Sequence, residues 1–224
     1  VRPPRLAGNA PLIASAGAAG LMIAPLPGLK TDDQIYAYWE TILSRLGPDI
    51  PVCYQDYPQT TQVFTSVSVL HRLIDAFPNL VMLKHEEGSG LNKITRIRER
   101  SDAGKGRRIS ILVGNGGLYL PQELQRGVDG AMTGFAYPEM LVGVVEKHLA
   151  GDPAGAEDLF DAYLPLLRHE QQMGFGLAIR KEVLRRRGAI ACSAIRHPGP
   201  KLNAVDHREL DGLMARLEAK LARL

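Results

Sequence analysis

A lysine that follows a short apolar segment is the residue of this chain best suited to covalent chemistry. Leu80 to Leu83 are apolar, Lys84 comes next, and His85, Glu86 and a turn at Gly88 follow. If the apolar residues form a buried strand, the amine lies at its rim, where desolvation disfavours the ammonium form and lowers the pKa. Such an amine attacks carbonyl carbon. The competing interpretation is a strand-end lysine whose ammonium group reaches water.

Three other segments also place polar or glycine residues directly after apolar runs. They are Tyr54-Gln55-Asp56-Tyr57-Pro58, Gly114-Asn115-Gly116 and Met132-Thr133-Gly134. The carboxyl ends of parallel strands lie at one edge of a sheet, where α/β proteins place their sites. We therefore expect these segments to surround one site together with Lys84.

Five β-then-α units must position these segments. Thr31 to Gln34 form a capping-box pattern that opens the first helix, and Gly47-Pro48 ends it. The strands are almost entirely apolar, which predicts a parallel sheet covered on both faces. The expected strands are 20–25, 50–56, 80–84, 108–114 and 130–134, and the expected helices are 31–46, 66–77, 91–101, 119–126 and 139–149.

Beyond Gly151 the pattern is helical only. Apolar residues recur at helical spacing over 156–172, 177–187 and 206–223. Helices of this kind pack on the α/β part or on a neighbouring subunit. The first 19 residues are the least regular part of the chain, and only 12–19 could form a helix.

The composition indicates an ordinary soluble globular protein. Apolar residues make up 45% and charged residues 23% of 224 residues, with a formal charge of +3. Arginine clusters at 96–108 and 180–187 lack interleaved aromatic residues, so we expect solvated helix faces and no nucleic-acid partner. The apolar run 17–26 is too short to span a bilayer, so no membrane partner is expected. Cys53 and Cys192 lie in apolar surroundings without ligand spacing, which favours buried thiols in the cytoplasm.

The order of these segments resembles the dihydrodipicolinate synthase and N-acetylneuraminate lyase family over about residues 16 to 224. The resemblance implies a (β/α)8 TIM barrel, of which this sequence holds about five β/α units. Residues 1–150 would form the partial barrel, and 151–224 a C-terminal helical segment packed on it. The family resemblance also implies a homo-oligomer, either a dimer or a tetramer.

The same resemblance implies a class I aldolase or lyase that acts on pyruvate or a related 2-oxo acid. Lys84 matches the lysine that forms a Schiff base with the keto carbon. The imine is itself the electron sink, so no cofactor is expected. No metal site is expected either, because the histidines are scattered and no His, Asp or Glu set has ligand spacing.

The family's proton-shuttling tyrosine lies on the strand before the lysine, and two residues compete for its position. A one-residue insertion aligns Tyr54 with it, whereas an ungapped count back from Pro58 places Gln55 there. Adjacent residues of a strand point to opposite faces, so only one of the two faces the site. A phenol transfers a proton and an amide does not. We take Tyr54 as the catalytic residue and Gln55 as a substrate-binding alternative.

The remaining matches concern residues around the bound keto acid. Gly114 and Asn115 match a glycine–aspartate turn, and Met132 and Thr133 match a strand end that lies over the substrate. A tight turn and a packed strand are the structural alternatives. His85 could either tune the Lys84 amine or be solvated, and the solvated interpretation is favoured.

Two departures from the family pattern limit these expectations. Dihydrodipicolinate synthases carry an arginine two residues after the proline of the tyrosine segment, and here that position is Thr60. This argues against aspartate semialdehyde as the second substrate. The match also starts near the fourth strand of the barrel, so the carboxylate-binding loop of the earlier strands has no counterpart in this sequence. The alternative function is therefore a catalytically impaired or non-catalytic member, either a fragment, a degenerate paralogue or a ligand-binding module.

Overall fold

The computed structural model describes residues 8, 12 and 15–224 and divides into two compact units. Unit 1 comprises the described residues of Val1–Gly114 together with Gln125–Met132, and unit 2 comprises Asn115–Leu124 and Thr133–Leu224. Of the helix expected at 12–19, residues 13 and 14 lie outside the described residues; Leu12 and Ser15 are helical, and 16–19 are not.

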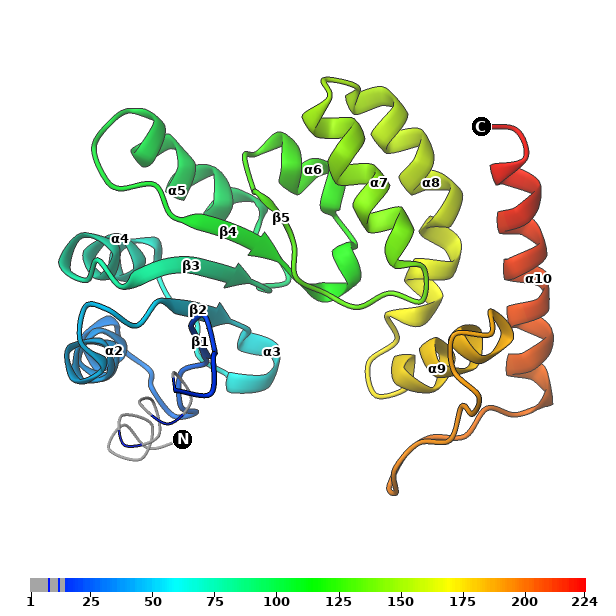
Figure 1. Ribbon diagram of the computed structural model, residues 1–224, viewed down its shortest axis with the longest axis horizontal. Coiled ribbons are helices and arrows are strands. Elements are labelled where there is room, and N and C mark those ends of the chain that lie inside the picture. The colour runs from blue at the N-terminus through cyan, green and yellow to red at the C-terminus, as the bar shows by residue number, and fades with distance from the viewer. Residues whose placement is uncertain (1–7, 9–11, 13–14) are drawn as a thin grey trace. The chain divides into compact units, whose positions relative to one another are not determined.

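Unit 1 contains a five-stranded sheet whose strands follow one another in sequence order (Figure 1). Every neighbouring pair is parallel, and β1 and β5 form the two edges. This succession of parallel strands with intervening helices is the predicted α/β arrangement of consecutive barrel units. The strands are β1 (Leu21–Ile23), β2 (Val52–Asp56), β3 (Leu80–His85), β4 (Ser110–Val113) and β5 (Gly130–Ala131).

Two helices of unit 1 begin at side-chain caps, whereas α3 (Pro58–Thr61) and α5 (Leu91–Asp102) begin without one. The helix α2 (Asp32–Leu46) has the predicted capping box between Thr31 and Gln34, and α4 (Val67–Ala76) begins after Ser66, whose hydroxyl accepts from the Val69 N–H at 3.1 Å. The single turn α3 was not predicted, and its first residue is a proline with φ suited to that position.

The core of unit 1 lies between these helices and one face of the sheet. Trp39 of α2 is fully buried and stacks on Tyr54 of β2, with the ring centroids 4.1 Å apart. Lys93 of α5 reaches Asp56 on that same face. Both α2 and α5 therefore contact one face of the sheet, the arrangement found in the wall of a (β/α)8 barrel and different from the expected placement of helices on both faces.

One arginine of α5 is structural, contrary to the expected solvated face. Arg98 is 4% exposed and donates to the carbonyl oxygens of Ile109 and Gly127 at 2.8 and 2.6 Å. It also pairs with Asp129 at 2.7 Å. Arg98 therefore ties α5 to the segments that enter β4 and β5.

Unit 2 is helical, as predicted for the end of the chain. In it, α7 packs along α8, and α10 packs against α8 as well. Because α7 packs on α8, residues 133–150 group with the C-terminal helices, so the compact units do not separate at the predicted residue 150. The elements are η1 (Asn115–Gly117), α6 (Leu120–Gln125), α7 (Pro138–Leu149), α8 (Pro153–Glu170), α9 (Gly176–Arg186) and α10 (Ala204–Leu221).

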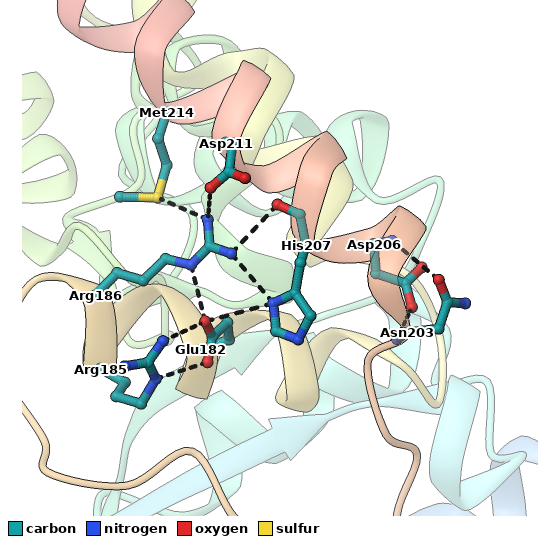
Figure 2. Close-up of polar contacts among 8 residues, drawn as sticks. All are labelled: Glu182, Arg185, Arg186, Asn203, Asp206, His207, Asp211 and Met214. Atoms are coloured by element: carbon teal, nitrogen blue, oxygen red, sulfur yellow. Dashed lines mark hydrogen bonds and ion pairs between the residues drawn. The ribbon is translucent and has the colours of Figure 1, made fainter.

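A cluster of charged side chains joins α9 to α10 (Figure 2). The carboxylate of Glu182 accepts hydrogen bonds from Arg185 and Arg186, each at 2.8 Å. Arg186 continues to Asp211 of α10 at 2.7 Å and to the carbonyl oxygen of His207 at 3.3 Å. Hydrogen bonds from these arginines hold the pKa of Glu182 at about 2, despite the opposing effect of burial.

Two further expectations concern the burial of the cysteines and the presence of a membrane-spanning helix. Cys53 is buried, but Cys192 is exposed, contrary to the expectation that both thiols are buried. Among the described residues, no helix has the length and apolar character needed to cross a membrane.

Candidate active site

The pairing of β2 with β3 decides which residues share the face of Lys84. Gln55 is the partner of Lys84, whereas Tyr54 pairs with Leu83 and Asp56 with His85. Paired residues of neighbouring strands point to the same side, and successive residues alternate. Gln55 and Lys84 therefore share one face, and Tyr54 lies on the other.

Lys84, Gln55 and Glu86 form a compact polar group on this face. Lys84 Nζ lies 3.3 Å from Glu86 Oε2, and the amide nitrogen of Gln55 donates to the same oxygen at 2.8 Å. The side chains of Lys84 and Glu86 are 14% and 9% exposed. An amine and a carboxylate are thus held side by side in partial isolation from water, and this pairing brings a nucleophile next to a proton acceptor.

Tyr54 does not belong to this group. Its ring has no exposed surface, stacks on Trp39, and forms a short hydrogen bond through its hydroxyl to that of Thr65. Burial raises the pKa of Tyr54 above its ordinary value, with Asp56 adding to the effect. The assignment of Tyr54 as the catalytic phenol is therefore corrected: Tyr54 is a core aromatic residue, and Gln55 occupies the position beside the lysine.

Gly114, at the end of β4, makes room for Glu86. Its N–H donates to the His85 carbonyl oxygen at 3.2 Å, which continues the pairing of β3 with β4. A Cβ added at Gly114 would overlap the carboxylate of Glu86. The glycine at this predicted site position is thus required by the placement of Glu86.

The other predicted pocket residues lie at the ends of β4 and β5. The Met132 N–H donates to the Val113 carbonyl oxygen at 2.8 Å and so extends the sheet of unit 1. In unit 2, the Thr133 hydroxyl accepts from the Gly116 N–H at 2.7 Å, and Asn115 has a positive φ of 50°. Thr133 thus ties together the two turns that follow β4 and β5. Contact of Asn115, Met132 or Thr133 with a substrate stays a prediction.

His85 is buried on the opposite face, contrary to the expectation that it is solvated. It is 2% exposed, and its Nδ1 lies 3.1 Å from Asp56 Oδ2. Lys93 donates to the same carboxylate at 2.7 Å. Burial pushes the pKa of Asp56 upward, but the hydrogen bond from His85 and the charge of Lys93 outweigh it, so the pKa lies below its ordinary value.

Glu86 is the site residue that the sequence reasoning passed over. It lies two residues after Lys84, so the alternation of an extended segment places both side chains on one face. The two-residue spacing is visible in the sequence, but it is informative only if the chain stays extended and paired beyond Lys84. The structure shows this pairing, because the Glu86 N–H donates to the Asp56 carbonyl oxygen at 2.9 Å. Among the described residues, no group of three or more His, Cys, Asp or Glu side chains is placed to hold a metal ion.

Known proteins resemble the chain in both sequence and structure. A solved structure described as dihydrodipicolinate synthase from Rhodopseudomonas palustris is 47% identical, with a TM-score of 0.87 over 92% of this chain and 69% of that chain. The solved structure of 4-hydroxy-tetrahydrodipicolinate synthase from Methylacidiphilum fumariolicum shares the fold. It is 20% identical, with a TM-score of 0.80 over 97% of this chain and 70% of that chain. No protein-family model matches the chain.

Among curated proteins, L-2-keto-3-deoxyarabonate dehydratase from Azospirillum brasilense is 28% identical over 191 residues, which are 85% of this chain. The chain spans 59% of the length of that protein.

Proposed function

Because the chain belongs to the dihydrodipicolinate synthase and N-acetylneuraminate lyase family, we propose that it is a class I, Schiff-base-forming aldolase or lyase. Its substrate would be pyruvate or a related 2-oxo acid, and the reaction would make or break a bond to the carbon chain of that acid. The observation that carries this proposal is the amine of Lys84, 14% exposed and 3.3 Å from the carboxylate of Glu86.

The proposed chemistry begins with attack of the Lys84 amine on the keto carbon, C2, of the substrate. Loss of the carbonyl oxygen as water leaves a protonated imine. Removal of a proton from C3 then moves the C–H electron pair toward the imine nitrogen and gives an enamine. The enamine either attacks an electrophile or expels a group from C4, and hydrolysis of the imine returns the free lysine.

Glu86 is the group that we assign to the proton transfer at C3. Gln55 stands where the family has a phenol, and an amide has no proton to exchange in this way. A carboxylate 3.3 Å from the Lys84 nitrogen lies close to the carbon that neighbours the imine. Gln55 donates to Glu86 at 2.8 Å and so orients the carboxylate.

The residue at position 60 bears on which substrate joins or replaces pyruvate in the reaction. Thr60, in the family's arginine position, lies exposed on the single turn α3 and carries no charge to hold a second carboxylate. The dehydratase from Azospirillum brasilense is named for a 2-keto-3-deoxy sugar acid. We therefore favour a 3-deoxy-2-oxo sugar acid that loses the C4 hydroxyl as water, over an aldehyde condensed with pyruvate.

Reductive trapping tests the proposal. The protein is incubated with pyruvate and sodium borohydride, and intact-mass measurement with peptide mapping locates the adduct. A reduced pyruvyl group on Lys84, absent from Lys84→Met and retained in Lys105→Met, is the expected result. A folded protein that traps no 2-oxo acid, including 3-deoxy sugar acids, would contradict the proposal and favour a non-catalytic family member.

A further inference from the structure

Four polar side chains meet on the helix-facing side of β2 and β3, directly behind the Lys84 group. They are Asp56, His85, Glu87 and Lys93, here called the back anchor. Asp56 Oδ2 accepts from Lys93 Nζ at 2.7 Å and lies 3.1 Å from His85 Nδ1. Lys93 Nζ also donates to Glu87 Oε2 at 2.7 Å. The side chains of Asp56, His85 and Lys93 are 1%, 1% and 9% exposed, and that of Glu87 is 26% exposed, so one largely buried ammonium group joins a buried carboxylate to a partly exposed one.

Two residues of the back anchor, Asp56 and His85, directly follow the site residues Gln55 and Lys84 on their strands. Gln55 pairs with Lys84, and the next pair, Asp56 with His85, points to the other face. The Glu86 N–H then donates to the Asp56 carbonyl oxygen at 2.9 Å. A shift of the Asp56–His85 pair along the strands would therefore shift Lys84 and Glu86 as well.

The back anchor also fixes the turn that carries Glu86. His85 Nε2 lies 3.3 Å from the Gly90 carbonyl oxygen, and a Cβ at Gly90 would overlap the His85 ring. The Gly90 N–H donates to the Glu87 carbonyl oxygen at 3.2 Å, which closes the turn. Glu86 thus lies between His85, which contacts Asp56, and Glu87, which contacts Lys93.

We propose that the back anchor positions Glu86 against Lys84, with Lys93 as its central residue. None of the four side chains touches the reacting atoms, so they are positioning residues, and the role in turnover rests on the proposed function. Loss of the Lys93 ammonium leaves two neighbouring carboxylates without their shared partner. We expect the turn to open and Glu86 to move away from Lys84, while the lysine itself stays on its strand.

The test compares Lys93→Met with Lys105→Met in the full chain. Lys105 is exposed in unit 1, so the control makes the same substitution outside the site. Two steps are measured separately: trapping of pyruvate on Lys84 by borohydride, and exchange of the pyruvate methyl protons for deuterium, followed by proton NMR. In Lys93→Met we expect trapping to stay within about twofold of the parent, and exchange to fall by about 10²-fold, the effect of misplacing a reacting group by about 1 Å.

A second measurement does not depend on turnover. Glu86 lies 3.3 Å from Lys84 Nζ, and the lysine side chain is only 14% exposed, so departure of Glu86 opens access of a reagent to the amine. Competitive acetylation of Lys84, read against the exposed Lys105 in the same molecule, should therefore accelerate several-fold in Lys93→Met. A purely structural role for Lys93 would leave this ratio unchanged in folded protein.

His85→Asn is a second variant, which tests the proposal even if the Lys93→Met protein does not fold. Asparagine keeps a donor near Asp56 and loses the contact with Gly90, so the same changes are expected at smaller size. Exchange and acetylation equal to those of the parent in either folded variant would overturn the proposal, and so would loss of the fold in both. A parent protein that neither traps nor exchanges pyruvate would refute the proposed function alone, and the acetylation ratio would then decide on the back anchor.

Discussion

Gln55 and Lys84 contact the same oxygen of Glu86, from neighbouring strands. The amide nitrogen of Gln55 is 2.8 Å and the lysine Nζ 3.3 Å from Glu86 Oε2. The amide of Gln55 donates to this oxygen and so orients the carboxylate, and an amide does not itself transfer a proton. In the proposed mechanism, Glu86 is the group that exchanges protons next to the amine.

Glu86→Gln should separate adduct formation from proton transfer. The glutamine keeps the size of the side chain but removes the base, so we expect methyl-proton exchange of pyruvate to fall by about 10²- to 10⁴-fold. Trapping on Lys84 should persist, because the nucleophile is unchanged. Glu99→Gln on the exposed side of α5 is the matched control and should exchange at the parent rate. Equal exchange by both variants would remove Glu86 from the mechanism.

Gly114→Ala should disturb the same carboxylate without replacing it. The new methyl group overlaps Glu86, a flexible side chain, so we expect Glu86 to move aside and exchange to fall by about tenfold or more, with little loss of stability. Gly212→Ala, on the exposed side of α10 with open space around it, serves as the control and should stabilise that helix by about 0.5 to 1 kcal/mol. Unchanged exchange in Gly114→Ala would show that Glu86 is not confined by this turn.

The order of the elements was predictable because each one carries a local signal. The Thr31–Gln34 capping box and the apolar strand before Lys84 each act over a few residues, and the structure contains both. The single turn at Pro58–Thr61 was missed because four residues carry no helical periodicity. The grouping of α7 with α8 was missed because it depends on packing between helices, which the sequence pattern does not specify.

The site was only partly predictable because strand register decides it. The sequence identified Lys84 as a strand-end lysine, but Tyr54 and Gln55 are adjacent, and a one-residue change of register exchanges their faces. Residue chemistry favoured the tyrosine, and pairing with β3 placed the glutamine beside Lys84 instead. The back anchor was beyond prediction, because Lys93 reaches Asp56 from a helix 37 residues further along the chain.

A buried carboxylate in α6 should make stability depend on pH. Burial raises the pKa of Glu123 to about 7, and its Oε2 is buried without a hydrogen-bond partner among the described residues. The folded state therefore binds this proton more tightly than the unfolded state, whose pKa is about 4.3, and stability falls as pH rises between these values. Glu123→Gln should flatten the dependence and stabilise the protein by about 2 kcal/mol at pH 8. Urea unfolding at pH 5 and pH 8 measures both effects.

Glu146→Gln is the control for this prediction, because Glu146 is exposed on α7. It should leave the difference in unfolding free energy between pH 5 and pH 8 as it is in the parent. A Glu123→Gln protein with the parental difference would mean that the Glu123 carboxylate is hydrated in the folded state.

At the junction of α9 and α10, stability should depend on pH in the opposite direction, increasing as pH rises. Hydrogen bonds from Arg185 and then Arg186 hold the pKa of Glu182 at about 2, so the folded state favours its ionised form. The stabilisation is fully present above the unfolded pKa of about 4.3 and is lost as pH falls toward about 2. Because Arg185 is 46% exposed, solvent screening reduces the contribution to about 1 to 2 kcal/mol. Glu182→Gln should therefore lower the unfolding free energy at pH 7 and lower it by only about half as much at pH 3, between the two pKa values, whereas Glu209→Gln, exposed on α10, should behave as the parent at both. An equal loss at pH 3 and pH 7 would assign the effect of Glu182 to its shape and not to its charge.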